Sequence, residues 1–163
     1  MACSRIALAD LVDAAAFPTD GSYPFRNHGV KPRHMSVRIV RLGSPRAAGE
    51  GLRIGTVRRP PRGVAKTDFA KADWYDVWYP NLAPSAELVA SGKAATTPGE
   101  WAAFSRAYRK AMGEPEASRT LDLLAALSHS ADFSVGCYCE DEGHCHRSLL
   151  RELLRERGAR IGD

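Results

Sequence analysis

The chain has 163 residues, of which 44% are hydrophobic and 26% are charged, and its formal net charge is +4. This composition is typical of one ordinary globular domain. No apolar run reaches the roughly 18 to 20 residues of a membrane span. Asp10 and Asp13 lie among the apolar residues of the N-terminal segment, so this segment lacks the pattern of a signal peptide. We therefore expect a cytoplasmic protein without a membrane partner, in which the four cysteines stay reduced and available for chemistry or metal.

Residues 1–34 differ in character from the rest of the chain. A short helix is predicted up to about residue 16, and residues 18–33 are rich in Pro, Gly and Asn. Met35 stands directly before the first predicted strand and is a candidate start site. We predict an N-terminal appendage over residues 1–34 and a single domain over residues 35–163.

Four strands are predicted from short apolar or alternating runs. They cover residues 36–42, 52–57, 73–79 and 133–139. A turn with two consecutive prolines, at residues 58–63, follows the second run. Because such a turn cannot continue a central strand, the chain must leave the sheet there.

Four helices follow from capping signals and helical spacing. Ser85 caps a short helix that reaches about residue 91, and residues 97–100 form a capping box with proline at the first helical position. Another helix covers about residues 116–129, and a leucine-rich helix follows Cys145 and ends near Gly158. Together these elements predict an α/β domain: a small mixed or mostly parallel sheet of about four strands, flanked by helices on both faces.

Residues 135–151 gather three of the four cysteines and two of the five histidines at the last strand-to-helix turn. Cys145 lies at the start of the helix, where unpaired backbone N–H groups favour a thiolate. One interpretation is therefore an enzyme in which Cys145 is the nucleophile. His144 or His146 would then act as the base, and Glu140 as an orienting residue or acid.

The same turn is a candidate anion site. Arg147 and the amides at the helix start are expected to hold an anion, and Cys139 to lie beside it. Arg58 and Arg62 would close the other side if their turn folds toward the same edge. The expected partner is a phosphate-bearing small molecule, a nucleotide or a nucleic acid, and this interpretation needs no cofactor.

Arg151 follows Cys145 at the spacing of cysteine phosphatases. That loop requires open, glycine-containing backbone, whereas the intervening residues have a helical pattern that carries Arg151 roughly 9 Å along the axis. We therefore set this interpretation aside.

An alternative is a non-enzymatic basic binding module with a structural or zinc-holding cluster. Cys137, Cys139, Cys145 and either His144 or His146 supply four permissible zinc ligands. Cys137 and Cys139 also fit a plainer role as small packed residues. Both alternatives stay open at this stage.

The run from Cys137 to Arg147, Cys-Tyr-Cys-Glu-Asp-Glu-Gly-His-Cys-His-Arg, with the helix after it, resembles the terminal motif of the domain of unknown function family 488. Residues 53–63 and 79–85 resemble the Arg-x-x-Pro-Arg-Gly turn and the Leu-Ala-Pro-Ser element of its YeaO-like branch. Val57 and Pro60 depart from that branch, which has an acidic and an aromatic residue there. The resemblance covers about residues 36–157 and implies a compact α/β domain without an established activity.

Overall fold

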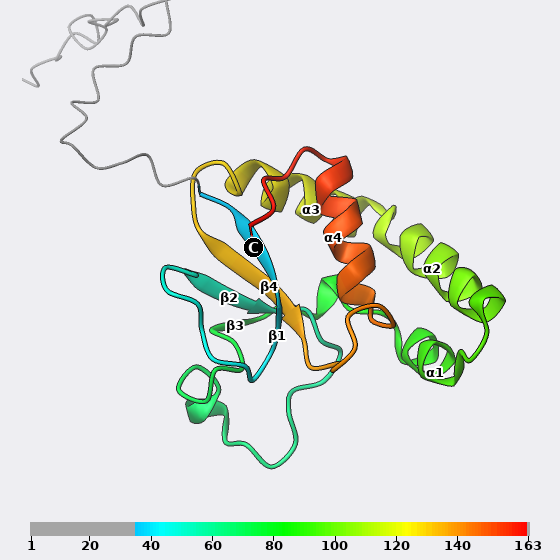
Figure 1. Ribbon diagram of the computed structural model, residues 1–163, viewed down its shortest axis with the longest axis horizontal. Helices are drawn as coiled ribbons and strands as arrows, with labels where there is room; N and C mark the ends of the chain where they lie inside the picture. The colour runs from blue at the N-terminus through cyan, green and yellow to red at the C-terminus, as the bar shows by residue number, and fades with distance from the viewer. Residues whose placement is uncertain (1–34, 163) are drawn as a thin grey trace, which may run out of the picture. The chain divides into compact units, whose positions relative to one another are not determined.

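The computed structural model describes residues 35–162. Four strands form one sheet in the order β1-β4-β2-β3, and every neighbouring pair is parallel (Figure 1). The strands are β1 (Val37–Arg41), β2 (Leu52–Gly55), β3 (Val77–Trp78) and β4 (Phe133–Cys137). Because β4 lies between β1 and β2, its residues are buried. Its carboxyl end lies between the carboxyl ends of these two strands.

The helices begin where the capping signals predict. Ser85 caps α1 (Ala86–Ala94) by accepting a hydrogen bond from the Leu88 amide, and the capping box formed by Thr97 and Glu100 opens α2 (Pro98–Met112). The remaining α-helices are α3 (Pro115–Leu127) and α4 (His146–Glu156), and two 3₁₀ turns are η1 (Lys66–Asp68) and η2 (Pro80–Leu82). No helix within residues 35–162 has the length and hydropathy that a membrane-crossing segment requires.

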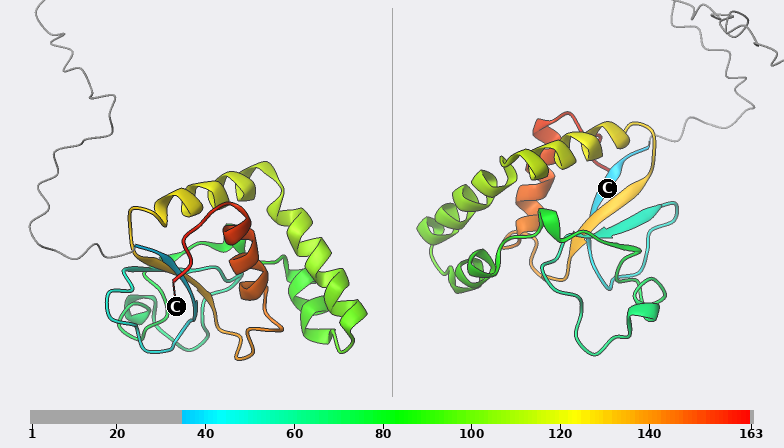
Figure 2. Two further views of the ribbon diagram at one scale, coloured as in Figure 1. Left: turned by 45° about the horizontal axis from the view of Figure 1, so that its top comes forward. Right: turned by 180° about the vertical axis from the view of Figure 1, so that it is seen from behind.

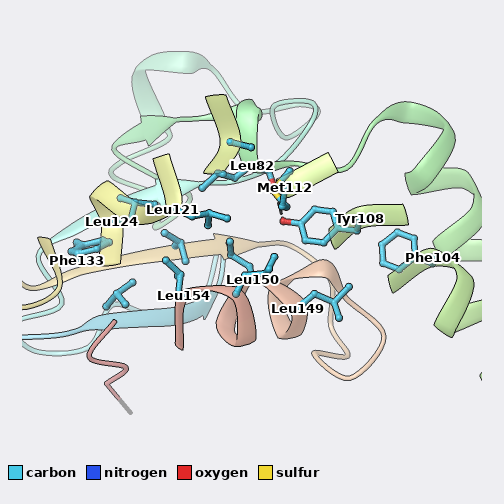
Figure 3. Close-up of a cluster of buried hydrophobic side chains, with 14 residues drawn as sticks. Leu82, Phe104, Tyr108, Met112, Leu121, Leu124, Phe133, Leu149, Leu150 and Leu154 are labelled. Carbon is cyan, nitrogen blue, oxygen red and sulfur yellow. Dashed lines mark hydrogen bonds between the residues drawn. The ribbon is translucent and has the colours of Figure 1, made fainter. Parts of the chain in front are cut away.

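The larger core lies between the sheet and the α-helices (Figures 2 and 3). Phe133 and Val135 of β4 contribute to it from the sheet, and Leu150 and Leu154 contribute from α4. Tyr108 of α2 lies fully buried in the same cluster and donates a hydrogen bond to the Leu82 carbonyl over 2.8 Å. This core fixes the start of α4 against the carboxyl end of β4.

The opposite face of the sheet is covered by loops and by η1. Arg53 of β2 is fully buried there, and its guanidinium pairs with Glu50, which also accepts a hydrogen bond from Ser134 over 2.7 Å. A second cluster, including Phe69 and Tyr75, packs over this side. The two faces are thus covered unequally, by four α-helices on one side and by loop segments with a 3₁₀ turn on the other.

The third strand is much shorter than the predicted range of residues 73–79. Asp73 has a positive φ of 56°, which breaks the extended backbone. The Asp76 carboxylate binds Arg46 over 2.8 Å and the Arg53 amide over 2.8 Å. Tertiary polar contacts therefore override the alternating pattern, and only Val77–Trp78 pairs with β2.

The predicted α/β class and the small, mostly parallel sheet of about four strands are confirmed, with every pairing parallel. The appendage over residues 1–34 lies outside the described residues. The division of the chain at residue 35 therefore stays a prediction.

Candidate functional site

The candidate site lies where β4 leads into α4. In a parallel sheet, ligand sites form beyond the carboxyl ends of the strands, beside helix N-termini. Cys137 ends β4, and Cys145 is the N-cap residue of α4, its Sγ accepting a hydrogen bond from the Arg147 amide over 3.5 Å. The loop between them carries Cys139 and brings it back toward both.

Three sulfur atoms meet at this point. The Sγ atoms of Cys137, Cys139 and Cys145 all lie within 4.8 Å of one another, and those of Cys137 and Cys139 are 3.6 Å apart. All three are free thiols; Cys137 and Cys145 are buried, whereas Cys139 is exposed. We call this group the thiol cluster.

Within the thiol cluster the pKa values of the cysteines shift in opposite directions. Hydrogen bonds from Cys137 and Cys145, assisted by the positive charge of Arg147, lower the pKa of Cys139 well below the usual range of a thiol. The same hydrogen bonding, together with burial, raises the pKa of Cys137 to about 11 and also raises that of Cys145. The exposed sulfur therefore has the lowest pKa of the three.

His146 lies beside the thiol cluster and is neutral near pH 7. Burial lowers the pKa of its imidazole to about 4. Its Nε2 atom lies 2.8 Å from the Thr56 carbonyl oxygen, and its Nδ1 atom lies 3.8 Å from Cys145 Sγ. The imidazole thus points its Nδ1 atom toward the Cys145 sulfur.

His144 occupies a different setting, on the exposed rim. Its Nδ1 atom lies 2.8 Å from Asp141 Oδ2, and its ring meets the Trp101 ring edge-on at 5.4 Å. Its exposed side chain belongs to the pocket wall rather than to the thiol cluster.

A pocket of about 690 Å³ opens in front of the thiol cluster and is lined by all three of its cysteines. Four cationic side chains also line it, namely Arg58, Arg59, Arg62 and Lys93. Four aromatic rings complete much of the wall, from Trp74, Trp101, Phe104 and Tyr138. No acidic residue within residues 35–162 lines this pocket.

The turn that carries the arginines is held in place from two sides. Arg58 donates hydrogen bonds to the Pro84 and Ala83 carbonyl oxygens, each over 3.0 Å. The Tyr138 hydroxyl donates a hydrogen bond to the Arg59 carbonyl oxygen. Arg59 and Arg62 have exposed side chains, and their guanidinium groups form no hydrogen bond or ion pair with the part of the chain that the structure describes.

Several of the predicted site residues converge and two do not. Arg58, Arg62, Cys139, Cys145, His144 and His146 all line the pocket. Arg147 turns inward, 3% exposed, and donates to the Glu140 carbonyl oxygen over 3.4 Å. The Glu140 carboxylate points to solvent and pairs with Arg41 over 3.1 Å. The functional roles given to these residues stay predictions.

Helices α1 and α2 form part of the pocket wall, which the sequence did not predict. Lys93 comes from α1 and Trp101 from α2, where α1 packs against α2 and α2 packs against α4. Trp101 follows a capping box at helical spacing, which is also the pattern of a core residue. No signal in the sequence separates the two roles.

The sequence of this chain matches a model of one protein family. Residues 37–158 match the family DUF488-N3a, which is described as the active DUF488-N3 subclade. Comparison with curated proteins and with solved structures found no match. The predicted relationship to the domain of unknown function family 488 is confirmed, and the YeaO-like detail is consistent with it. Because the match covers most of the chain, this protein belongs to the DUF488-N3a family.

Proposed function

We propose that this protein binds a mononucleotide in the pocket at the carboxyl edge of the sheet and acts on it at the thiol cluster. One observation carries the proposal: cationic side chains, aromatic rings and three sulfurs line the same pocket of about 690 Å³. Ligand pockets for small molecules are commonly roughly 300 to 1,000 Å³. A phosphate-bearing molecule with a planar base would use both the charge and the rings.

The phosphate would be held by the arginine turn. Arg59 and Arg62 present guanidinium groups without partners among residues 35–162, and Lys93 adds a third exposed cation from α1. A guanidinium donates two parallel hydrogen bonds to a phosphate. The pocket lining from residues 35–162 is cationic and contains no acidic side chain, which favours an anionic ligand.

The base would be held by the aromatic wall. Trp101 stacks on Phe104 with ring centroids 4.8 Å apart, and Trp74 meets Tyr138 edge-on at 5.7 Å. Stacking of one base on such a ring contributes about 1–3 kcal/mol. The rings come from different parts of the chain, so they border the pocket from more than one side.

A small ligand fits the charge distribution better than a nucleic-acid strand. Two arginines of this region are neutralised, because Arg151 of α4 pairs with Glu142 over 2.6 Å and Arg157, directly after the helix, pairs with Asp122 over 3.0 Å. A strand would need an unneutralised basic stripe outside the pocket.

Enzymatic activity is part of the proposal, because the pocket brings a ligand within reach of a cysteine sulfur. Within the pocket, Cys139 is the sulfur that solvent and ligand can reach. A cytoplasmic setting is part of the proposal, because closely spaced thiols persist in a reducing compartment.

The test is a titration of the full-length protein with AMP, followed by tryptophan fluorescence, since Trp74 and Trp101 line the pocket. We expect a saturable change that inorganic phosphate reverses. Arg62→Ala should weaken binding about tenfold to a hundredfold, the loss expected for a charge-assisted hydrogen bond. Arg119→Ala removes the same charge from the exposed side of α3, away from the pocket, and should bind like wild type.

Two results would overturn the proposal. One is the absence of saturable binding of AMP and of inorganic phosphate. The other is equal weakening by Arg62→Ala and Arg119→Ala, which would indicate general electrostatic attraction. Tighter binding of a single-stranded oligonucleotide than of AMP would favour a nucleic-acid ligand instead.

A further inference from the structure

We infer that Cys137, Cys139 and Cys145 together hold a zinc ion whose fourth coordination position faces the pocket. The three sulfurs already have the spacing of a zinc site. A tetrahedral zinc with Zn–S bonds of about 2.3 Å places its sulfurs about 3.8 Å apart. Here one pair is 3.6 Å apart, and all three Sγ atoms lie within 4.8 Å of one another.

The elements around the sulfurs hold them at this spacing. Cys137 is fixed by the central strand, and Cys145 by the N-cap of α4, where the Arg147 amide donates to its Sγ over 3.5 Å. Amide donors of this kind orient thiolate ligands around a metal. Cys139 lies on the connecting loop, outside both elements.

Arg147 supplies a charge that this site would neutralise. Its side chain is 3% exposed, and within residues 35–162 its Nε atom has no hydrogen-bond partner and no carboxylate lies at salt-bridge distance from it. A buried cation without an anionic partner is unfavourable. Zinc with three thiolates carries one net negative charge, which would balance Arg147 next to it.

The fourth position is open rather than closed by a fourth protein ligand. The three cysteines line the pocket, and Cys139 is exposed to it. His144 and His146 are left out of the ligand set, because the ligand atoms that gather within 4.8 Å of one another come from the three cysteines and from neither ring. Three protein ligands and one free position are characteristic of catalytic zinc sites, where the free position takes a water molecule or a substrate oxygen.

This inference rests on the proposed function only for the identity of the fourth ligand. A zinc ion at the end of the pocket would coordinate an anionic oxygen of the bound molecule, while the arginine turn holds its phosphate. The thiol cluster would then act through the metal instead of through a free thiolate.

The experiment measures zinc in full-length protein purified without chelator and then dialysed against metal-free buffer. We expect stoichiometric zinc, and replacement by Co²⁺ should give the thiolate charge-transfer absorption of a tetrahedral site. Cys139→Ser should weaken zinc binding by more than about 100-fold. This loss exceeds the 10–100-fold effect that is typical when a residue that only hydrogen-bonds to a metal ligand is replaced. His144→Ala should keep wild-type zinc affinity.

Cys139 is the best position to test, because its side chain is exposed and its substitution leaves the core intact. Circular dichroism of the variant will verify the fold. The inference is overturned if the wild type takes up no zinc when the ion is supplied, or if Cys139→Ser binds zinc as tightly as wild type. Alkylation of Cys139 at the same rate with and without zinc would also contradict it.

AMP titrations separate this inference from the proposed function. Zinc-loaded protein that binds neither AMP nor phosphate would overturn the nucleotide pocket alone. Protein that takes up no zinc but still binds AMP in an Arg62-dependent way would overturn the zinc site alone.

Discussion

The Nε2 atom of His146 lies 2.8 Å from the backbone carbonyl oxygen of Thr56. Because a carbonyl oxygen only accepts hydrogen bonds, Nε2 carries the hydrogen and Nδ1 keeps its lone pair. Thr56 directly follows β2, and His146 is the first residue of α4. This one bond therefore connects the two elements on either side of the thiol cluster and fixes the orientation of the imidazole.

We expect His146→Ala to destabilise the protein by about 1–3 kcal/mol, because the Thr56 carbonyl would stay buried without its donor. Urea unfolding at pH 7, followed by circular dichroism, measures this loss. His144→Ala is the matched control, since His144 is exposed and should change the free energy of unfolding by no more than about 0.5 kcal/mol. Equal losses in the two variants would contradict a structural role for the bond.

Local signals in the sequence were enough to predict most of the helical layer. The Thr97 and Glu100 capping box forms as expected, and α4 begins directly after Cys145. Such signals involve residues within one turn of each other, so they do not depend on tertiary contacts. The range of the third strand was wrong because Asp76 is bound by Arg46, which lies far from it in sequence.

Local sequence patterns also predicted part of the candidate site. The thiol cluster comes from one short segment, and its sulfurs meet as the spacing indicated. The inward turn of Arg147 could not be predicted, because a residue in the first turn of a helix can face either solvent or the sheet. The contribution of Lys93 depends on how α1 packs, which no local pattern encodes.

The buried pair of Glu50 and Arg53 predicts a loss of stability in acid. Burial alone would raise the pKa of Glu50, but hydrogen bonds from Arg53, Ser134 and the Ala47 amide lower it to about 2. A carboxyl group whose pKa is lowered by folding stabilises the protein above its unfolded pKa of 4.5, and this contribution is lost as the pH falls toward 2. The loss amounts to about 3 kcal/mol. Urea unfolding between pH 7 and pH 2 measures it.

Glu50→Gln should distinguish the contribution of the Glu50–Arg53 pair from the effect of protonating other carboxyl groups in acid. The variant leaves the Arg53 charge buried without its partner, so we expect a loss of about 3–5 kcal/mol at pH 7 and a weaker dependence on pH below 4.5. Glu114→Gln changes an exposed carboxyl group at the start of α3 and should keep the wild-type pH profile. A Glu50→Gln profile parallel to that of wild type would show that another carboxyl group is responsible.

Gly136 connects the packing of the sheet to the geometry of the thiol cluster. A Cβ atom at this position would lie 2.6 Å from the Val40 carbonyl oxygen and 2.8 Å from the Leu42 side chain. The Val40 oxygen belongs to the neighbouring strand β1 and cannot rotate away as a flexible side chain would. We therefore expect Gly136→Ala to reduce the free energy of unfolding by at least about 1–3 kcal/mol, as overpacking does. Urea unfolding measures the change.

Gly99→Ala is the matched control, because among the described residues no atom outside its chain neighbours and the nearby backbone of its own helix lies within 4 Å of the place that its methyl group would take. Gly99 stands in the first turn of α2. Alanine there should be neutral or stabilise the helix by up to about 1 kcal/mol. Since Cys137 follows Gly136 directly, the displacement forced by Gly136→Ala should also move one sulfur out of the thiol cluster. Zinc affinity should then fall in Gly136→Ala and stay at the wild-type level in Gly99→Ala. A destabilised Gly136→Ala variant that still binds zinc like wild type would mean that Cys137 is not a ligand.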